Sequence, residues 1–314
     1  MNRIQKTVMP MILEEYMNYL IYIESRTKST AEEYAGDIAL FFRYLKIKYD
    51  LVSKNTPYSN ISLDDIDKDF VYKITVDNIL DFLSYLKKHR KYSDSTERRK
   101  IASIRSYFKY AHGIAKYTSI KIDCDLKLPK RIDNMPTFLS EEASDILINS
   151  VKSRNLIRDK MIIALFLHTG IKLMELCNLN ITTIYGEYIK ITNADRFERY
   201  IELDDMLTQY LEIYLKWRYD KYKDIQLKRN DKYALFLSEQ QKRIGPRAIQ
   251  NIVLNAAKNA MLNEKASPQK LRHSFAVLLY KKGFSIKEIQ KILGHENISS
   301  TKVYLRIPEL NNKI

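Results

Sequence analysis

Four side chains near the C-terminal end of the chain have types and spacing that suit covalent chemistry on an oxyanion. Gln269 and Arg272 lie in the string QKLRHSFA, His295 ends the string LGH, and Tyr304 ends the string TKVY. An arginine can direct two parallel hydrogen bonds to phosphate or carboxylate oxygens, and a histidine can donate another. A tyrosine hydroxyl can form a covalent intermediate. Taken singly, each residue type on a helix is usually structural, so the combination and its order matter.

Capping signals place these side chains on successive helices. The Ser-Pro pair at 267–268 predicts the start of a helix that should stop at Gly283. A capping box, SIKE at 285–288, predicts a second helix that ends at Gly294. Tyr304 then falls on a further helical segment.

The segment upstream of these helices predicts the rest of a site-bearing domain. An apolar helix at 157–168 should end at Thr169-Gly170, and a new helix should start close to Lys172. The stretches 183–192 and 197–203 are rich in β-branched and aromatic residues, with a turn at 193–196 between them. Residues 233–237 are a candidate third strand, and helical periodicity returns at 205–222 and 246–262.

These strings resemble the signature of the tyrosine recombinases of the integrase/Xer type. That family has H-x-x-R, then L-G-H, then a nucleophilic tyrosine, as in QKLRHSFA, LGH and TKVY here. The string TGIKLMEL at 169–176 resembles its T-G-L-R-x-x-E-L box, and FERY at 197–200 resembles the strand after its G-K-G turn. The resemblance spans nearly the whole chain, because the N-terminal helices and linker match a core-binding domain.

The resemblance implies a role for each matching residue. Tyr304 would attack a DNA phosphodiester and form a 3′-phosphotyrosine that conserves the bond energy, so no ATP, other cofactor or metal ion is expected. Arg272 would bind the non-bridging oxygens, with His295 as a further donor. His273 would pack structurally, and Glu175 would brace Lys172 or a helix end.

Three positions depart from the family pattern. Lys172 stands in place of an arginine and loses the two-pronged grip on phosphate. Gln269 replaces the histidine of H-x-x-R, so it can donate a hydrogen bond but cannot carry a proton. Ala194 stands where a lysine would act as general acid, which makes Lys190 and Arg196 the candidate substitutes. Losing a general acid costs on the order of 10²–10⁴-fold in rate, so the sequence predicts a slow enzyme.

The composition fits a polyanionic partner. The net charge is +15 and the isoelectric point is about 9.4, which suits nucleic acid or an acidic membrane surface, although a merely lysine-rich protein would look the same. Cys124 and Cys177 lack CxxC spacing, which argues against a disulfide scaffold or zinc ribbon. The first residues, MNRIQKTVMPMILEEY, lack the apolar core expected of a signal peptide, and the most apolar run, 161–167, is too short to span a bilayer. We therefore expect a cytoplasmic, nucleoid-associated protein.

The first third predicts helices that present basic side chains. Apolar periodicity predicts a helix at 12–21, and a capping box at 29–32 predicts the start of a second helix. Thr75 is expected to cap a third helix, and a fourth should run from about Asp94 to Ala111. The polar residues 48–72 predict a loop. Basic residues here and elsewhere are expected to contact the DNA backbone, although a solvated helix face is the simpler interpretation of those on the fourth helix. These residues are Arg98, Arg99, Lys100, Arg105, Lys130, Arg131, Arg243 and Arg247.

The predicted fold class is mainly α with two domains. A helical, SAM-like core-binding domain is expected at residues 1–116, a linker with two prolines at 117–136, and a mixed α/β catalytic domain with a small antiparallel sheet at 137–314. The ten residues after Tyr304 contain Pro308 and predict at most a short helix. The exchange of C-terminal helices between subunits that Xer-like recombinases use is therefore not expected.

Two functions from different classes remain open. One is an active recombinase that cuts, exchanges and rejoins strands at two sites through a Holliday junction, as a homo- or hetero-tetramer on double-stranded DNA. The other is a silent DNA-binding protein that regulates, or partners an active recombinase, as Lys172, Ala194 and Gln269 suggest. A type IB topoisomerase shares the chemistry but fits the N-terminal domain and the LGH spacing less well. A membrane-surface protein fits least, for want of an amphipathic lipid-facing helix.

Overall fold

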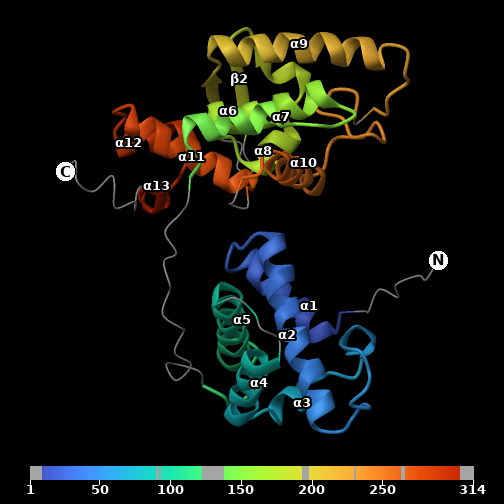
Figure 1. Ribbon diagram of the computed structural model, residues 1–314. Helices are drawn as coiled ribbons and strands as arrows, with labels where there is room; N and C mark the ends of the chain where they lie inside the picture. The colour runs from blue at the N-terminus through green and yellow to red at the C-terminus, as the bar shows by residue number, and fades with distance from the viewer. Residues whose placement is uncertain are drawn as a thin grey trace. The chain divides into compact units, whose positions relative to one another are not determined.

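The computed structural model describes residues 9–89, 92, 94–121, 138–192, 198–229, 231–262 and 266–304. The chain divides into two compact units, Met1–Asp133 and Asn134–Ile314 (Figure 1). Among the described residues, the regular elements of the first unit are all helices, and the second unit adds one three-stranded antiparallel sheet. The predicted fold class is thus confirmed. None of the helices within the described ranges is both long enough and apolar enough to cross a membrane.

The first unit is a helical bundle around an aromatic core. Its helices are α1 (Met11–Tyr22), α2 (Lys28–Lys48), α3 (Lys68–Tyr72), α4 (Val76–His89) and α5 (Asp94–Gly113). Helix α2 contacts α1, α4 and α5, and buried rings such as Tyr16, Phe41 and Phe108 fill the space between them.

Three details of the first unit differ from the sequence prediction. Helix α2 begins at Lys28 because Thr27, not Ser29, accepts the capping hydrogen bond, from Thr30 N at 3.2 Å. The expected loop contains α3, which Asp67 caps at Phe70 N. Tyr117 and Ile120, placed in the predicted linker, are buried in the core of this unit, and residues 122–136 of that linker lie outside the described ranges.

A buried ion cluster joins α2 to α5. Asp37, only 4% exposed, accepts hydrogen bonds from Lys100 Nζ at 2.7 Å, Arg99 Nη1 at 2.5 Å and Ser103 Oγ at 2.9 Å. Lys100 is itself 6% exposed. Two cations and one hydroxyl therefore satisfy a single buried carboxylate, and the charge of Lys100 is used inside the bundle.

Replacing Asp37 by alanine should destabilise the first unit by about 3 kcal/mol, because it leaves a buried ammonium without a counter-ion. The midpoint of urea unfolding, followed by circular dichroism, measures the loss. Asp77→Ala, at an exposed position in the first turn of α4, is the control and should cost less than about 1 kcal/mol. Equal midpoints for the two variants would show that the cluster contributes no net stability.

The second unit is built around one buried helix. Helix α7 (Leu156–Thr169) is apolar on most of its surface and packs against α6 (Glu141–Asn149), α9 (Asp205–Tyr222), α10 (Pro246–Asn259) and α11 (Pro268–Lys281). Figure 1 shows α7 between α9 on one side and α8 (Leu173–Asn178) and α10 on the other. Helices α12 (Ile286–Leu293) and α13 (Ile298–Tyr304) pack beside α11.

The sheet has the order β1-β2-β3, from Ile184–Tyr185, Tyr188–Thr192 and Glu198–Glu202. The stretch predicted as one strand, 183–192, is two strands, because Gly186 takes a φ of +58° and turns the chain. The segment 233–237, a candidate third strand, makes only isolated bridges and does not join the sheet. The strand that completes the sheet is β1.

The register of the sheet decides which side chains face the core. Ile191 lies opposite Arg199, and Lys190 lies opposite Tyr200. Directly paired residues share a face, and neighbours along a strand point to opposite faces. Arg199 therefore lies on the face of the buried Ile191, and Lys190 lies on the other face.

Candidate active site

Helix ends and helix starts bring the candidate residues together. Helix α7 ends at Gly170, whose φ of +60° is left-handed, and α8 begins directly after Lys172. Gln269 and Arg272 stand three residues apart at the start of α11, so they lie on one helical face. Gly294, with a φ of +65°, ends α12. These boundaries confirm the capping and glycine signals of the sequence.

Arg272 connects three of these segments from inside the unit. It is 2% exposed, and its guanidinium donates to Gly170 O from Nη1 and to Leu293 O, at 2.8 Å, from Nη2. Those carbonyls belong to the ends of α7 and α12. Burial lowers the pKa of Arg272, but an arginine keeps its charge at neutral pH. A fixed positive charge thus stands where the three helices meet.

Tyr304, the last residue of α13, is buried beside this charge. Its Oη accepts a hydrogen bond from Gln269 Nε2 at 2.6 Å. Its ring stacks on His273, with ring centroids 4.8 Å apart, and His273 Nε2 lies 2.8 Å from Tyr304 O. The hydroxyl of Tyr304 therefore meets the Gln269 side chain, while His273 holds the ring and backbone.

His295 follows the turn at Gly294 and is neutral at physiological pH. Its ring lies 5.5 Å from the ring of Tyr304, and its Nδ1 lies 2.9 Å from Thr301 Oγ1. Burial, and then the nearby charges of Arg272, Lys172 and Arg199, lower the pKa of His295 to about 4. A hydroxyl that donates to Nδ1 leaves the proton of the neutral ring on Nε2, where it can be donated.

Arg199 on β3 is a site residue to which the sequence analysis gave no role. Its guanidinium donates in a fork to Glu175, from Nη1 to Oε1 at 2.8 Å and from Nη2 to Oε2 at 2.7 Å. Glu175 also accepts from Lys172 N at 2.9 Å, so it caps the start of α8 as expected. Lys172 Nζ is farther away, 3.9 Å from Glu175 Oε1 and 3.5 Å from Gly294 O.

The structure does not bring Lys190 to this cluster. Lys190 Nζ pairs with Glu198 at 2.7 Å, and that hydrogen bond raises its pKa. Its side chain lies on the face of the sheet opposite to Arg199. The other candidate proton donor, Arg196, lies outside the described residues, as does Ala194.

Several residues expected at a DNA backbone have other partners. Lys100 is buried on Asp37, and Arg99 is paired with the same carboxylate, so the expectation for Lys100 is wrong in this structure. Arg243 donates to Cys177 O, Leu179 O and Asn180 Oδ1, which makes it a brace at the C-terminal end of α8.

The remaining backbone candidates differ in exposure. Arg98 and Arg105 are half-buried, Arg247 is exposed, and Lys130 and Arg131 lie outside the described residues. Sequence periodicity gives the face of a helix but not the carboxylate that another helix places against it.

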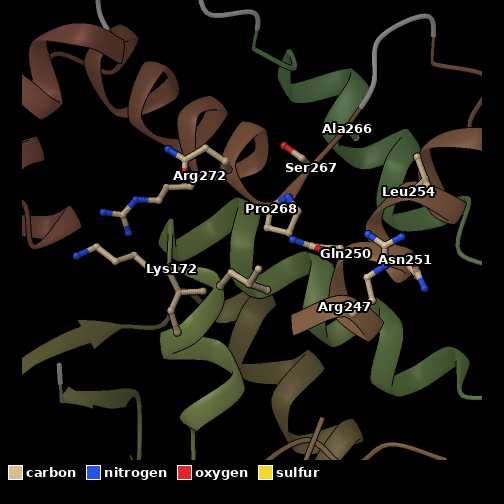
Figure 2. A pocket seen from close by; sticks show the side chains of 12 residues that line it. Lys172, Arg247, Gln250, Asn251, Leu254, Ala266, Ser267, Pro268 and Arg272 are labelled. Carbon is tan, nitrogen blue, oxygen red and sulfur yellow. The ribbon is translucent and has the colours of Figure 1, made fainter. Parts of the chain in front are cut away.

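A cavity of about 370 Å³ opens beside the cluster. Its lining includes Lys172, Arg272 and Gln269, with Arg247 and Asn251 from α10. Figure 2 shows Lys172 and Arg272 extending in one direction and Arg247 and Asn251 on the other side of the cavity. The described residues contain no group of three or more His, Cys, Asp and Glu that could hold a metal ion. Arg199, Lys172 and Arg272 lie around the single carboxylate of Glu175, and this excess of positive charge suits an anionic ligand.

Comparison with known proteins gives consistent similarities. Residues 137–309 match the Phage integrase family. The chain is 34% identical over 302 residues to tyrosine recombinase XerC of Caldanaerobacter subterraneus subsp. tengcongensis, covering 96% of this chain and 84% of that protein. It is 26% identical to tyrosine recombinase XerD of Oceanobacillus iheyensis, covering 96% and 95%.

Solved structures share the fold. The XerH site-specific recombinase bound to its difH substrate superposes with a TM-score of 0.66 at 20% identity, covering 96% of this chain and 82% of that one. A lambda integrase tetramer bound to a Holliday junction superposes with a TM-score of 0.64 at 14% identity, covering 93% and 76%.

Proposed function

Because the chain belongs to the phage integrase family of tyrosine recombinases, we propose that it cuts and rejoins DNA strands at specific sites. The reaction proceeds through a 3′-phosphotyrosyl bond on Tyr304 and a Holliday junction. Double-stranded DNA is the substrate, which places the protein with the nucleoid. Its working form is a homo- or hetero-tetramer on paired sites, as the lambda integrase tetramer on a Holliday junction suggests.

The position of the Tyr304 hydroxyl is the observation that carries this proposal. Oη lies at the edge of a positively charged cluster and is already oriented by Gln269 at 2.6 Å. A phosphodiester placed against Oη would meet Arg272 and Lys172, with His295 as a neutral donor. Positioning and charge neutralisation of this kind are the main terms in phosphoryl transfer.

The chemical step forms one bond and breaks one. Tyr304 Oη bonds to phosphorus and loses its proton, while the P–O5′ bond breaks and the 5′ oxygen takes up a proton. Gln269 cannot accept the first proton, Ala194 has no group that could give the second, and Lys190 lies on the face of the sheet opposite to Arg199. Both protons are exchanged with solvent, so we infer an enzyme slowed on the order of 10²–10⁴-fold relative to one with a positioned acid.

A covalent-trapping assay tests the proposal. Nicked duplexes that tile the flanks of the gene are incubated with the protein, and covalent adducts are separated on a denaturing gel beside a native binding shift. We expect an adduct with wild type and none with Tyr304→Phe. Tyr214→Phe, which removes a buried hydroxyl bonded to Leu235 O, is the matched control and should keep the adduct. Equal adduct from Tyr304→Phe and wild type would refute the assignment of the nucleophile.

A silent DNA-binding protein is the second candidate, and the altered site favours it. Lys172 cannot hold a phosphate with two parallel hydrogen bonds as an arginine would, and Gln269 cannot carry a proton. This function predicts specific binding shifts without an adduct in any variant. It also predicts that Tyr304→Phe leaves the biological effect of the protein unchanged.

Arg247→Ala should weaken DNA binding at every sequence, because an exposed arginine beside the cavity suits a phosphate contact that positions without specifying. The slope of log affinity against log salt should fall by about 0.9, the value for one lost phosphate contact. Binding shifts at several salt concentrations measure it. Lys216→Ala, an exposed cation on α9, is the control and should leave the slope unchanged. Identical slopes for both variants would remove Arg247 from the DNA interface.

A further inference from the structure

We propose that Arg199 is a positioning residue. It occupies the carboxylate of Glu175, so that the ammonium of Lys172 is not drawn into a close pair, and it fixes the Gly294–His295 turn. Lys172 and His295 then face the same phosphate. The inference rests on the proposed function and adds a residue to its site. Arg199 itself need not touch DNA, because it acts through Glu175, Lys172 and the turn.

The first support is the way in which Glu175 is occupied. Its carboxylate accepts both prongs of Arg199 and the backbone N–H of Lys172, while Lys172 Nζ stays 3.9 Å away. A carboxylate three residues along a helix is an ordinary partner for a lysine. Without Arg199, the ammonium of Lys172 would be the nearest cation available to the buried carboxylate. Arg199 therefore leaves the Lys172 ammonium with long contacts only, to Glu175 Oε1 at 3.9 Å and to Gly294 O at 3.5 Å, so that it can turn to an anion.

The second support is the packing of Arg199 against the turn before His295. A Cβ on Gly294 would lie 2.9 Å from Arg199 Nη1 and 3.1 Å from its Cζ. The side chain of Arg199 is 10% exposed, and its Nε is a buried nitrogen without a hydrogen-bond partner among the described residues. A planar guanidinium thus lies directly against the glycine, and its fork to Glu175 fixes its place. Glycine at 294 serves both the left-handed φ and this close approach.

The third support is electrostatic. The charged groups around His295 are Arg272 on α11, Lys172 and Glu175 at α8, and Arg199 on β3, with the ring of Tyr304 on α13. The positive charge of Arg199 helps to keep the imidazole neutral, and Glu175 opposes it. Removing the charge of Arg199 should therefore raise the pKa of His295, whereas removing a buried arginine away from the site should leave it unchanged.

The test uses the full chain and two readouts. The imidazole of His295 is titrated by NMR in the free protein, with its signal assigned by loss in His295→Gln. The adduct rate is measured on the nicked duplex that traps wild type. Arg199→Gln should raise the pKa of His295 and lower the adduct rate by about 10–100-fold. The double variant Arg199→Gln/Glu175→Gln should recover part of that rate, because no carboxylate remains to sequester Lys172, while the Gly294–His295 turn still lacks its guanidinium.

Control variants separate positioning from stability. Arg158→Gln breaks another buried arginine–carboxylate pair, with Asp159, away from the site, and should lower stability without moving the titration of His295. If Arg199→Gln does not fold, Arg199→Lys decides: it keeps the charge but loses the fork, so the rate should fall about tenfold with the titration unchanged. A wild-type rate in Arg199→Lys would then overturn the proposal.

The two readouts also separate this inference from the proposed function. An unchanged titration and an unchanged adduct rate in folded Arg199→Gln overturn the role of Arg199. If wild type forms no adduct, the proposed function fails, and the titration alone still decides whether Arg199 acts on His295.

Discussion

Replacing Arg272 by lysine should lower the rate of Tyr304–DNA adduct formation on the order of 10²–10³-fold. The guanidinium is held by the carbonyls of Gly170 and Leu293 and stands beside Tyr304, so it is the cation most firmly placed for a phosphate in front of Oη. A lysine keeps one charge but supplies no rigid fork. The single-turnover adduct rate at saturating DNA measures the effect, because it separates the chemical step from binding.

A second buried arginine provides the control for Arg272→Lys. Arg218 is 8% exposed and donates to the carbonyls of Leu235, Lys232 and Ala234, none of which belongs to the cluster around Tyr304. Arg218→Lys should lower the unfolding midpoint of the chain as much as Arg272→Lys does, yet keep the wild-type adduct rate. Equal rate losses in the two variants would mean that Arg272 acts only through stability.

The features of the fold that the sequence predicts are those that local chemistry decides. The helix starts at Ser140, Ser267 and Ser285 have capping side chains that bond within three residues, so a single sequence reveals them. The helix ends at Gly170 and Gly294 need a left-handed φ that glycine adopts without strain. Tyr304 and Arg272 were found for a different reason, namely the order of the family strings.

The features that the sequence misses depend on partners far along the chain. The charge of Lys100 is used by Asp37, 63 residues earlier, and no periodicity in α5 indicates that partner. The role of Arg199 depends on the register that pairs it with Ile191 and on a fork to Glu175, 24 residues away. The same register turns Lys190 to the other face of the sheet. Strand propensity alone does not fix register, so the sequence could not exclude Lys190 as the general acid.

Replacing Lys172 by arginine should raise the adduct rate about 10–100-fold, because it restores a bidentate grip on one phosphate. The position can accept the change without rearranging the core. The side chain of Lys172 is 47% exposed and lines the cavity beside Arg272, and its structural contact with Glu175 runs through the backbone N–H, which the substitution keeps. Lys172→Gln, which removes the charge, should lower the rate instead.

The outcome of Lys172→Arg also decides between the two candidate functions. An adduct in wild type that grows in Lys172→Arg describes a working recombinase slowed by one residue. An adduct that forms only in Lys172→Arg describes a site that is intact apart from its second guanidinium. If binding shifts are normal and neither variant forms an adduct, the silent DNA-binding protein is favoured, and the missing proton donor at Ala194 is then a larger defect than the missing fork. Ala194→Lys in the Lys172→Arg background then tests whether the proton donor is the larger defect. A positioned general acid is worth on the order of 10²–10⁴-fold in rate, so the double variant should form the adduct that Lys172→Arg alone does not form.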